Sequence, residues 1–332
     1  YIVLKSKFRN LFLAFGILAV IIMLFTFDVS YDELLDNLRR AGFYLPLVLV
    51  LWLFIYLINT LSWYIILRSS GPVNSLSFAR LYKFTVSGFA LNYVTPVGLM
   101  GGEPYRIMEL TPYVGVERAT SSVILYVMMH IFSHFCFWLS SVLIYVFFYP
   151  VGWGMGIVLG LTTLFCLLLV TLFIKGYRNG MAVACVRLGS HIPFLKKRAV
   201  RFAELHKEKL ETIDSQIALL HQQRKSTFYL ALGLEYTARI VGCLEVWLIL
   251  NVLTTDVSFV GCILIVAFSS LLANLLFFLP MQLGGREGGF ALAVAGLSLS
   301  GAYGVFAALI TRVREMVWIV IGLVLMKIGN RR

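Results

Sequence analysis

The chain has 332 residues, of which 60% are apolar and only 13% are charged, and its mean hydropathy is +0.89. A soluble domain is about 45–50% apolar and about 25% charged, so one soluble core cannot hide this excess. The composition excludes a disordered chain and a disulfide-rich secreted scaffold, and it argues against a soluble nucleotide-binding enzyme. We therefore expect an integral membrane protein with room for roughly eight elements of about 20 residues each.

The net charge is +12, from 28 basic and 16 acidic residues. In a membrane protein, such an excess first indicates positive cytoplasmic loops and contact with anionic lipid headgroups, so we expect no nucleic-acid partner. The five cysteines are scattered and form no CxxC pair. This favours buried apolar roles over metal or redox chemistry, and we expect neither a metal nor a cofactor.

The apolar runs, taken in chain order, predict six full membrane spans. The first covers 11–27 and follows three basic residues, and we expect it to be retained as a span. Segment 28–40 is short and mixed, which predicts an interfacial amphipathic helix. The remaining predicted spans are 43–67, 119–149, 153–174, 228–253 and 303–328.

The only clearly polar block, 175–225, holds 11 Lys or Arg residues against 4 Glu or Asp residues. Apolar spacing over 199–222 predicts a basic amphipathic helix within it. The positive charge places this connector in the cytoplasm, together with both chain termini. We therefore expect one membrane domain over 1–332, divided by the connector into a first half at 1–174 and a second half at 226–332.

Charge counting leaves two segments that must enter and leave the membrane on the same side. Basic residues place 68–83 and 103–118 inside, so the segment between them is predicted to be re-entrant, within a motif at 84–110. By the same reasoning, 259–299 enters and returns on the outer side. We expect an all-α polytopic membrane protein in which two re-entrant broken helices of opposite orientation form an inverted repeat.

The two predicted re-entrant segments share a sequence pattern. In both, a proline precedes a glutamate by seven residues and a glycine pair stands before the acid, as in NYVTPVGLMGGE at 92–103 and NLLFFLPMQLGGRE at 274–287. Proline breaks a helix, paired glycines permit a sharp reversal, and inverted repeats with broken helices are typical of transporters. Ordinary loops at the ends of spans are the alternative. The predicted break residues are Pro96, Gly101, Gly102, Pro280, Gly284 and Gly285.

Three motifs resemble those of a known membrane family: GGEPYR at 101–106, LPMQLGGREGGF at 279–290 and ITRVREMVWIVIGL at 310–323. They are similar to the flippase-like family, which is the membrane region of lysylphosphatidylglycerol synthases (multiple peptide resistance factors) and of their stand-alone relatives. The resemblance implies a polytopic helical fold, lipid translocation across the bacterial cytoplasmic (inner) membrane, and a homodimer. Because no aminoacyl-transferase domain follows Arg332, we expect a stand-alone, non-enzymatic member that works beside a separate lipid-modifying enzyme.

Ionisable groups at membrane depth cost roughly 2.5–3.5 kcal/mol each, and those that are kept are usually functional. Glu235 and Arg239 share a helix face, and that spacing also fits a pair that only locks helices together. For Arg286, Arg312 and Arg314 we favour a functional role, because Arg offers bidentate donors suited to phosphate. The residues expected along the translocation path are Asn92, Glu103, Arg106, Glu235, Arg239, Asn274, Arg286, Glu287, Arg312, Arg314 and Glu315.

His130 and His134 lie on one face of the 119–149 span. Their spacing can bind a metal or relay protons, but Ile131 stands where a HExxH motif needs a glutamate. Because two ligands alone do not define a metal site, a hydrogen-bonded structural pair is the favoured interpretation.

Three functions fit these features, and lipid translocation is favoured. A charged headgroup, from a phospholipid, an aminoacyl-phospholipid or a lipid-linked sugar, would cross through the Arg and Glu interior while its acyl chains stay in the bilayer. No GxxxxGK[ST] loop is present, so we expect movement down a gradient or coupled to ions rather than direct ATP drive. Glu235, Glu245 or a histidine would then carry the proton.

Two alternatives remain open. The first is an integral-membrane transferase in which Glu103 or Glu287 acts as general base on a lipid-linked substrate. The second is an ion-coupled transporter of a small molecule, which the inverted repeat fits equally well. A lateral opening between helices would favour a lipid over a small molecule.

Overall fold

The protein is all-helical in the part that the structure describes, with only short connections between helices and no strand. The expected first span at 11–27, most of the 175–225 connector, and Pro96, Pro280 and Gly284 lie outside the described residues. A computed structural model describes residues 36, 39–73, 75–94, 101–179, 207–208, 211–212, 214–215, 225–275 and 285–328.

Three long apolar helices coincide with predicted spans. They are α3 (Tyr44–Ser69), α6 (Val116–Phe148) and α7 (Trp153–Asn179). Within the described ranges, these are the helices long and apolar enough to cross a membrane. The outer side of α7 is strongly apolar, and Leu164 is 67% exposed on it. This exposure fits a surface whose solvent is lipid rather than water.

Two further long helices, α11 (Lys225–Leu250) and α14 (Gly301–Lys327), differ in composition from those three. At 1.5 Å per residue they are about 39 and 40 Å long, which is enough to cross a bilayer. They nevertheless carry ionisable residues near their middles. Those residues are buried inside the protein, including Glu235, Glu245 and Arg314. Both helices therefore turn a polar stripe toward the interior.

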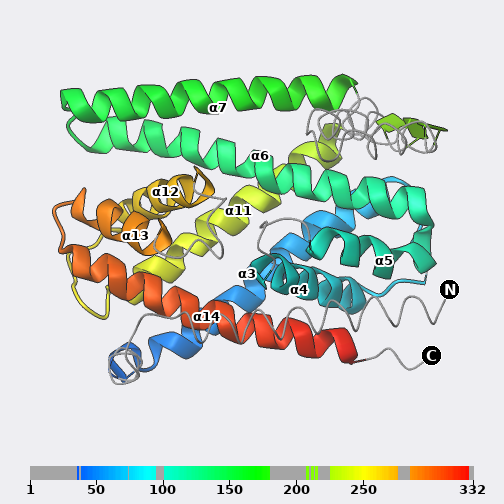
Figure 1. The fold of residues 1–332 in the computed structure, drawn as a ribbon, viewed down its shortest axis with the longest axis horizontal. Helices are drawn as coiled ribbons and strands as arrows, with labels where there is room; N and C mark the ends of the chain where they lie inside the picture. Colours follow the sequence, from blue (N-terminus) through cyan, green and yellow to red (C-terminus); the bar gives the residue numbers. More distant parts are fainter. Residues whose placement is uncertain are drawn as a thin grey trace, which may run out of the picture.

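Four shorter helices form two pairs: α4 (Phe78–Val94) with α5 (Gly102–Val114), and α12 (Phe259–Leu275) with α13 (Gly285–Ala295). In Figure 1 the first pair lies right of centre and joins its neighbours α3 and α6 on the right. The second pair lies left of centre and joins α11 and α14 on the left. The two pairs thus connect to the rest of the chain at opposite ends of the molecule.

The same order of helices occurs in both halves of the chain. The elements α3, α4, α5 and α6 have 26, 17, 13 and 33 residues, and α11, α12, α13 and α14 have 26, 17, 11 and 27. The two 26-residue helices pack against each other. The first helix of each short pair packs against the last helix of the other half, α4 on α14 and α12 on α6. The halves are therefore interlocked.

Glycines allow the closest approaches between these helices. A Cβ atom at Gly102 in α5 would lie 2.2 Å from the backbone oxygen of Gly88 in α4. A Cβ atom at Gly322 in α14 would lie 2.5 Å from the Cβ of Ala90 in α4. Small residues at such contacts let helices approach closely enough to pack well inside a membrane.

Candidate functional site: a charged central cavity

A cavity of about 260 Å³ lies at the centre of the molecule, between helices of both halves. Its lining combines aromatic rings from α3, α4 and α6 with polar groups from α11, α12 and α14. The charged and histidine side chains in the lining are His130, His134, Glu235, Glu245, Arg239 and Arg314.

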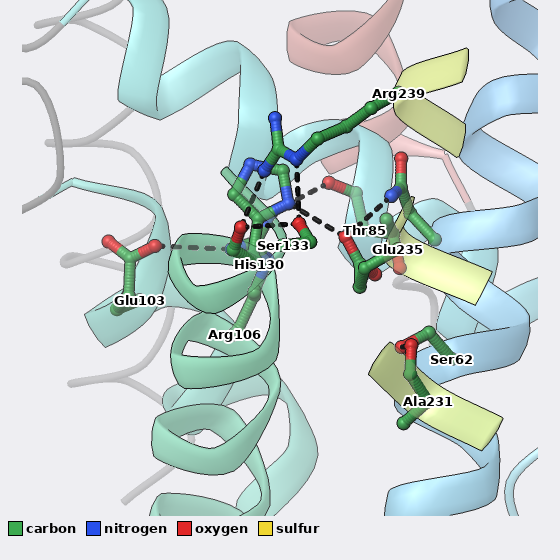
Figure 2. A network of polar contacts seen from close by, with 10 residues as sticks. Ser62, Thr85, Glu103, Arg106, His130, Ser133, Ala231, Glu235 and Arg239 are labelled. Atoms are coloured by element: carbon green, nitrogen blue, oxygen red, sulfur yellow. Dashed lines mark hydrogen bonds and ion pairs between the residues drawn. The ribbon is translucent and has the colours of Figure 1, made fainter. Parts of the chain in front are cut away.

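Glu235 is completely buried and lines this cavity, and Figure 2 shows its contact with His130. Its Oε2 atom accepts a hydrogen bond from Asn59 Nδ2 at 3.0 Å and lies 2.8 Å from His130 Nδ1. Because an ionised carboxylate can only accept hydrogen bonds, His130 carries a proton on Nδ1 when Glu235 is ionised. The other oxygen of Glu235, Oε1, has no hydrogen-bond partner among the described residues.

Arg239 follows Glu235 by one helical turn, but the two do not form the local pair that their spacing allows. Its Nε atom donates to Ser133 Oγ at 2.6 Å, and its Nη2 atom donates to the backbone oxygen of His130. No carboxylate in the described part of the chain lies within ion-pair distance of this guanidinium. The cavity wall therefore holds a cation whose direct partners are neutral.

Arg314 is held differently, by a bidentate ion pair with Glu245 and a longer contact of its Nη1 atom with Glu315 Oε1 at 3.7 Å. Its Nε and Nη2 atoms donate to the two carboxylate oxygens at 2.8 and 3.0 Å. Trp52 Nε1 donates to the same carboxylate at 2.8 Å, and its ring centroid lies 3.8 Å from the guanidinium carbon. This arrangement ties α3, α11 and α14 together and neutralises the charge of Arg314.

A second polar network lies where α4 and α5 meet. Glu103 Oε1 accepts hydrogen bonds from Asn92 Nδ2 at 2.9 Å and from Arg106 Nη1 at 3.2 Å. Asn92 Oδ1 accepts from the backbone nitrogen of Gly102 at 2.8 Å, and Arg106 Nη2 donates to the backbone oxygen of Thr85 at 3.3 Å. The polar residues predicted around the first break therefore bind one another and join the two helices.

The structure places the other predicted residues as follows. Asn274 lines the central cavity, and its Nδ2 donates to Ser270 in its own helix at 2.8 Å. Arg312 and Glu315 are buried on α14 outside the lining of this cavity. Gly101 directly precedes α5, whereas Gly102 and Gly285 are the first residues of α5 and α13. The side chains of Arg286 and Glu287 lie outside the described part.

Sequence analysis missed several members of the site. It interpreted His130 as one of a structural histidine pair, whereas the imidazole is bonded to Glu235 and its ring centroid is 5.6 Å from that of His134. It gave Asn59 and Ser133 no role. A polar amide inside the apolar run 43–67 was the available signal for Asn59, because such groups need a partner in lipid. A lone serine gives no comparable signal, since hydroxyls often bond to their own helix.

A smaller, apolar pocket of about 140 Å³ lies between α6, α7, α12 and α13. Trp138 lines it, and the Nε1 atom of that residue donates at 3.0 Å to Ser270 Oγ, which belongs to the lining of the central cavity. Val158 and Leu292 also line the pocket and are 42% and 62% exposed on the outer surface. The pocket therefore lies between the charged cavity and the apolar exterior.

Comparison with known protein families gives a match over most of the chain. The family described as "Lysylphosphatidylglycerol synthase TM region" matches residues 11–323, which is most of the chain. No curated protein and no solved structure gives a significant match.

Proposed function

This chain belongs to the family of the lysylphosphatidylglycerol synthase TM region, and from that premise we propose that it moves a lipid with a charged headgroup between membrane leaflets. The observation that carries the proposal is a charged cavity and an apolar pocket whose linings are joined by the Trp138–Ser270 hydrogen bond. A headgroup phosphate would bind Arg239, whose direct partners are neutral. An acyl chain would occupy the apolar pocket beyond Trp138.

The proposal assigns the two short helix pairs to the path of the lipid. We propose that α4–α5 and α12–α13 are re-entrant pairs of an inverted repeat, which enter the bilayer from opposite faces. The shared order of helices and the connections at opposite ends in Figure 1 support this. Broken helices at membrane depth are tolerated where they line a cavity, and alternating access around such a site is a known transport principle.

The apolar pocket favours a lipid over a small soluble molecule. A transporter for a small polar molecule needs a polar path closed to the bilayer, and a side pocket with exposed apolar walls serves no purpose in it. A lipid carrier needs both environments at once, because its substrate is amphipathic. The Trp138–Ser270 hydrogen bond, which joins a residue of the pocket lining to a residue of the cavity lining, supports such an arrangement.

The shared chemistry of the candidate cargoes is a phosphate next to acyl or prenyl chains. It is present in phospholipids, in aminoacylated phospholipids and in lipid-linked sugars. The proposed setting is the bacterial cytoplasmic membrane, with both termini and the 175–225 connector on the cytoplasmic side. A homodimer and a separate lipid-modifying enzyme are further parts of the proposal.

The test is translocation in proteoliposomes that contain the full chain and labelled lipids. The panel comprises phosphatidylglycerol, an aminoacylated phosphatidylglycerol and a polyprenyl-phosphate sugar. We expect protein-dependent transfer of at least one of them, slowed roughly tenfold or more by Arg239→Gln, because hydrogen bonds to charged groups contribute about 1.5–3 kcal/mol. Arg68→Gln is the matched control, since Arg68 is exposed at the end of α3, and it should leave the rate unchanged.

Two results would contradict the proposal. Absence of protein-dependent transfer for every lipid in the panel would remove translocation as the function. A change in the mass of a supplied lipid would instead indicate a transferase. Size-exclusion profiles of both variants establish that a loss of transfer does not come from misfolding.

A further inference from the structure

We infer that the His130–Glu235 pair is a proton-binding site that couples lipid movement to a proton gradient. This inference rests on the proposed function and adds the source of its driving force. The sequence offers three kinds of proton carrier: Glu235 of α11, Glu245 of α11, or a histidine. The geometry of the central cavity favours His130, paired with Glu235, over Glu245.

His130 is the member of the pair that a proton can reach. Its side chain is 28% exposed and lines the cavity, whereas that of Glu235 is 0% exposed. With Glu235 ionised, Nδ1 of His130 carries a proton and donates it to the carboxylate. The Nε2 atom forms no hydrogen bond with any described residue, so it is the atom that takes up an additional proton.

Glu245 is unsuited to this role. Both of its oxygens accept hydrogen bonds from Arg314, and one also accepts from Trp52. A carboxylate with a bidentate guanidinium partner is strongly held in its charged form. Protonating Glu245 would break this bidentate pair and leave buried Arg314 the longer, 3.7 Å contact with Glu315, which is a costly change. Glu235 has no such partner, because Arg239 binds Ser133 and a backbone oxygen instead.

The charges around the pair determine what the proton does. The site combines the guanidinium groups of Arg106, Arg239 and Arg314 with the carboxylates of Glu103, Glu235, Glu245 and Glu315, the last of which lies 3.7 Å from Arg314. The uptake of one proton by His130 adds one positive charge to the cavity at low dielectric, which favours the binding of an anion there. The charged and titratable groups nearest to the pair and the cavity are Tyr56 of α3, Tyr93 of α4, Glu103 and Arg106 of α5, Tyr126, His130 and His134 of α6, Glu235, Arg239 and Glu245 of α11, and Arg314 and Glu315 of α14.

A proton on His130 and a phosphate anion in the cavity therefore promote each other's binding. Such coupling is reciprocal, since each ligand raises the affinity of the other by the same factor. One proton enters from the acidic side onto Nε2, crosses with one monoanionic headgroup, and leaves Nε2 on the alkaline side. For a lipid with one negative charge, the cycle moves no net charge. The inference is thus an electroneutral symport of one proton with one anionic lipid.

The first test measures the distribution of acyl-labelled phosphatidylglycerol between leaflets of proteoliposomes, by dithionite quenching. Without a gradient, the wild-type protein should only equilibrate the label. With a difference of about one pH unit and the membrane potential clamped, the label should become enriched up to about tenfold in the leaflet facing the alkaline side, since one pH unit is a factor of ten. Changing the clamped potential should not alter this ratio.

The variants separate coupling from translocation. His130→Asn keeps a donor toward Glu235 but has no second ring nitrogen, so the distribution of the label should no longer respond to the pH gradient, whatever rate of equilibration remains. Arg68→Gln, at an exposed position outside the cavity, is the control, and its response to the gradient should persist. Equilibration by the wild type that ignores the pH gradient would overturn the symport and leave the proposed function intact.

A second measurement does not depend on transport. Infrared difference spectra of the purified protein between about pH 5 and about pH 8, the range in which histidine titrates, should contain an imidazole band that His130→Asn removes. A carboxylate band that Glu235→Gln removes should change with it. If the wild type and both variants give the same difference spectrum, the pair binds no proton and the inference is wrong. A failure of transfer with these bands present would count against the proposed function instead.

Discussion

At the scale of single residues, two buried carboxylates on one helix have different neighbours. Glu245 is enclosed by a guanidinium and an indole, so its charge is fully compensated. Glu235 is bonded to an amide and to an imidazole, and one of its oxygens has no partner among the described residues. We interpret Glu245 as a structural residue that joins helices and Glu235 as a functional residue of the cavity.

This difference predicts effects of different size for the same substitution. Glu245→Gln breaks the bidentate pair with buried Arg314 and leaves it the longer, 3.7 Å contact with Glu315, so we expect it to lower the free energy of unfolding by about 3 kcal/mol, the lower end of the cost of breaking a buried ion pair. Glu235→Gln keeps an acceptor for Asn59, so its effect on stability should be clearly smaller, although translocation is impaired. Thermal unfolding of the detergent-solubilised variants measures the difference.

The control for this prediction removes both charges of the ion pair. Glu245→Gln combined with Arg314→Met should recover part of the lost stability, because replacing both charges of a buried pair costs less than removing one of them. Equal melting temperatures for Glu245→Gln and the wild type would show that the pair does not stabilise the fold.

The ionisable residues of the site were predictable because charges stand out in apolar runs. Their partners were not, because the partners are distant in the chain. Arg314 binds a carboxylate 69 residues away, and His130 binds one 105 residues away. Spacing along one helix instead indicated a Glu235–Arg239 pair, which the structure does not form. Only the packing of α3, α6, α11 and α14 decides which charges meet.

At the scale of helices, close contact between α4 and α5 depends on glycine. A Cβ atom at Gly102 would overlap the backbone oxygen of Gly88, 2.2 Å away. We therefore expect Gly102→Ala to destabilise the protein by about 1–3 kcal/mol, the usual cost of overpacking. Gly160→Ala in α7 is the control, since no atom lies within 4 Å of its Cβ position, and helix propensity predicts a gain of up to about 1 kcal/mol. The melting temperatures of the two variants test this prediction, and equal shifts in both variants would contradict it.

Sequence predicted where these helices begin and end better than it predicted what they contact. Prolines and paired glycines indicated both breaks, and α5 and α13 begin at Gly102 and Gly285. No pattern indicated that α4 packs on α14 and α12 on α6. In a membrane, the helix faces that contact protein and those that contact lipid are both apolar. Hydrophobic periodicity therefore does not show which face of a helix packs against another helix.

At the scale of the whole molecule, the fold predicts which connections face opposite sides of the membrane. In Figure 1 the α6–α7 and α11–α12 connections lie on the left, and the α3–α4 connection lies on the right. Helix α7 ends and α11 begins on the right as well, which agrees with the arrangement that charge counting predicts. Which of these sides is cytoplasmic stays a prediction.

Cysteine labelling tests this topology in a background where the native cysteines are replaced by serine. Gly152→Cys and Asp256→Cys lie in exposed connections at one end, and an impermeant maleimide should label them in intact cells. Ser75→Cys, in the α3–α4 connection, should react only after the membrane is opened. Labelling of all three cysteines from outside would contradict a topology in which these connections lie on two sides of the membrane. The reverse labelling pattern would show that the orientation in the membrane is opposite to the predicted one.

The proposal that a lipid headgroup crosses through the central cavity is tested most directly by measuring lipid translocation by a variant whose cavity is filled but whose charges are intact. Gly242 lines the cavity on α11, and a Cβ atom there approaches only Ile55 Cδ1, at 4.0 Å. The variant Gly242→Leu should therefore fold and yet translocate lipid roughly tenfold more slowly, equivalent to about 1.4 kcal/mol in the barrier. The control Gly233→Leu, at an exposed position of the same helix with no atom within 4 Å of its Cβ position, should match the wild type. Wild-type rates for Gly242→Leu would mean that the headgroup does not cross through this cavity.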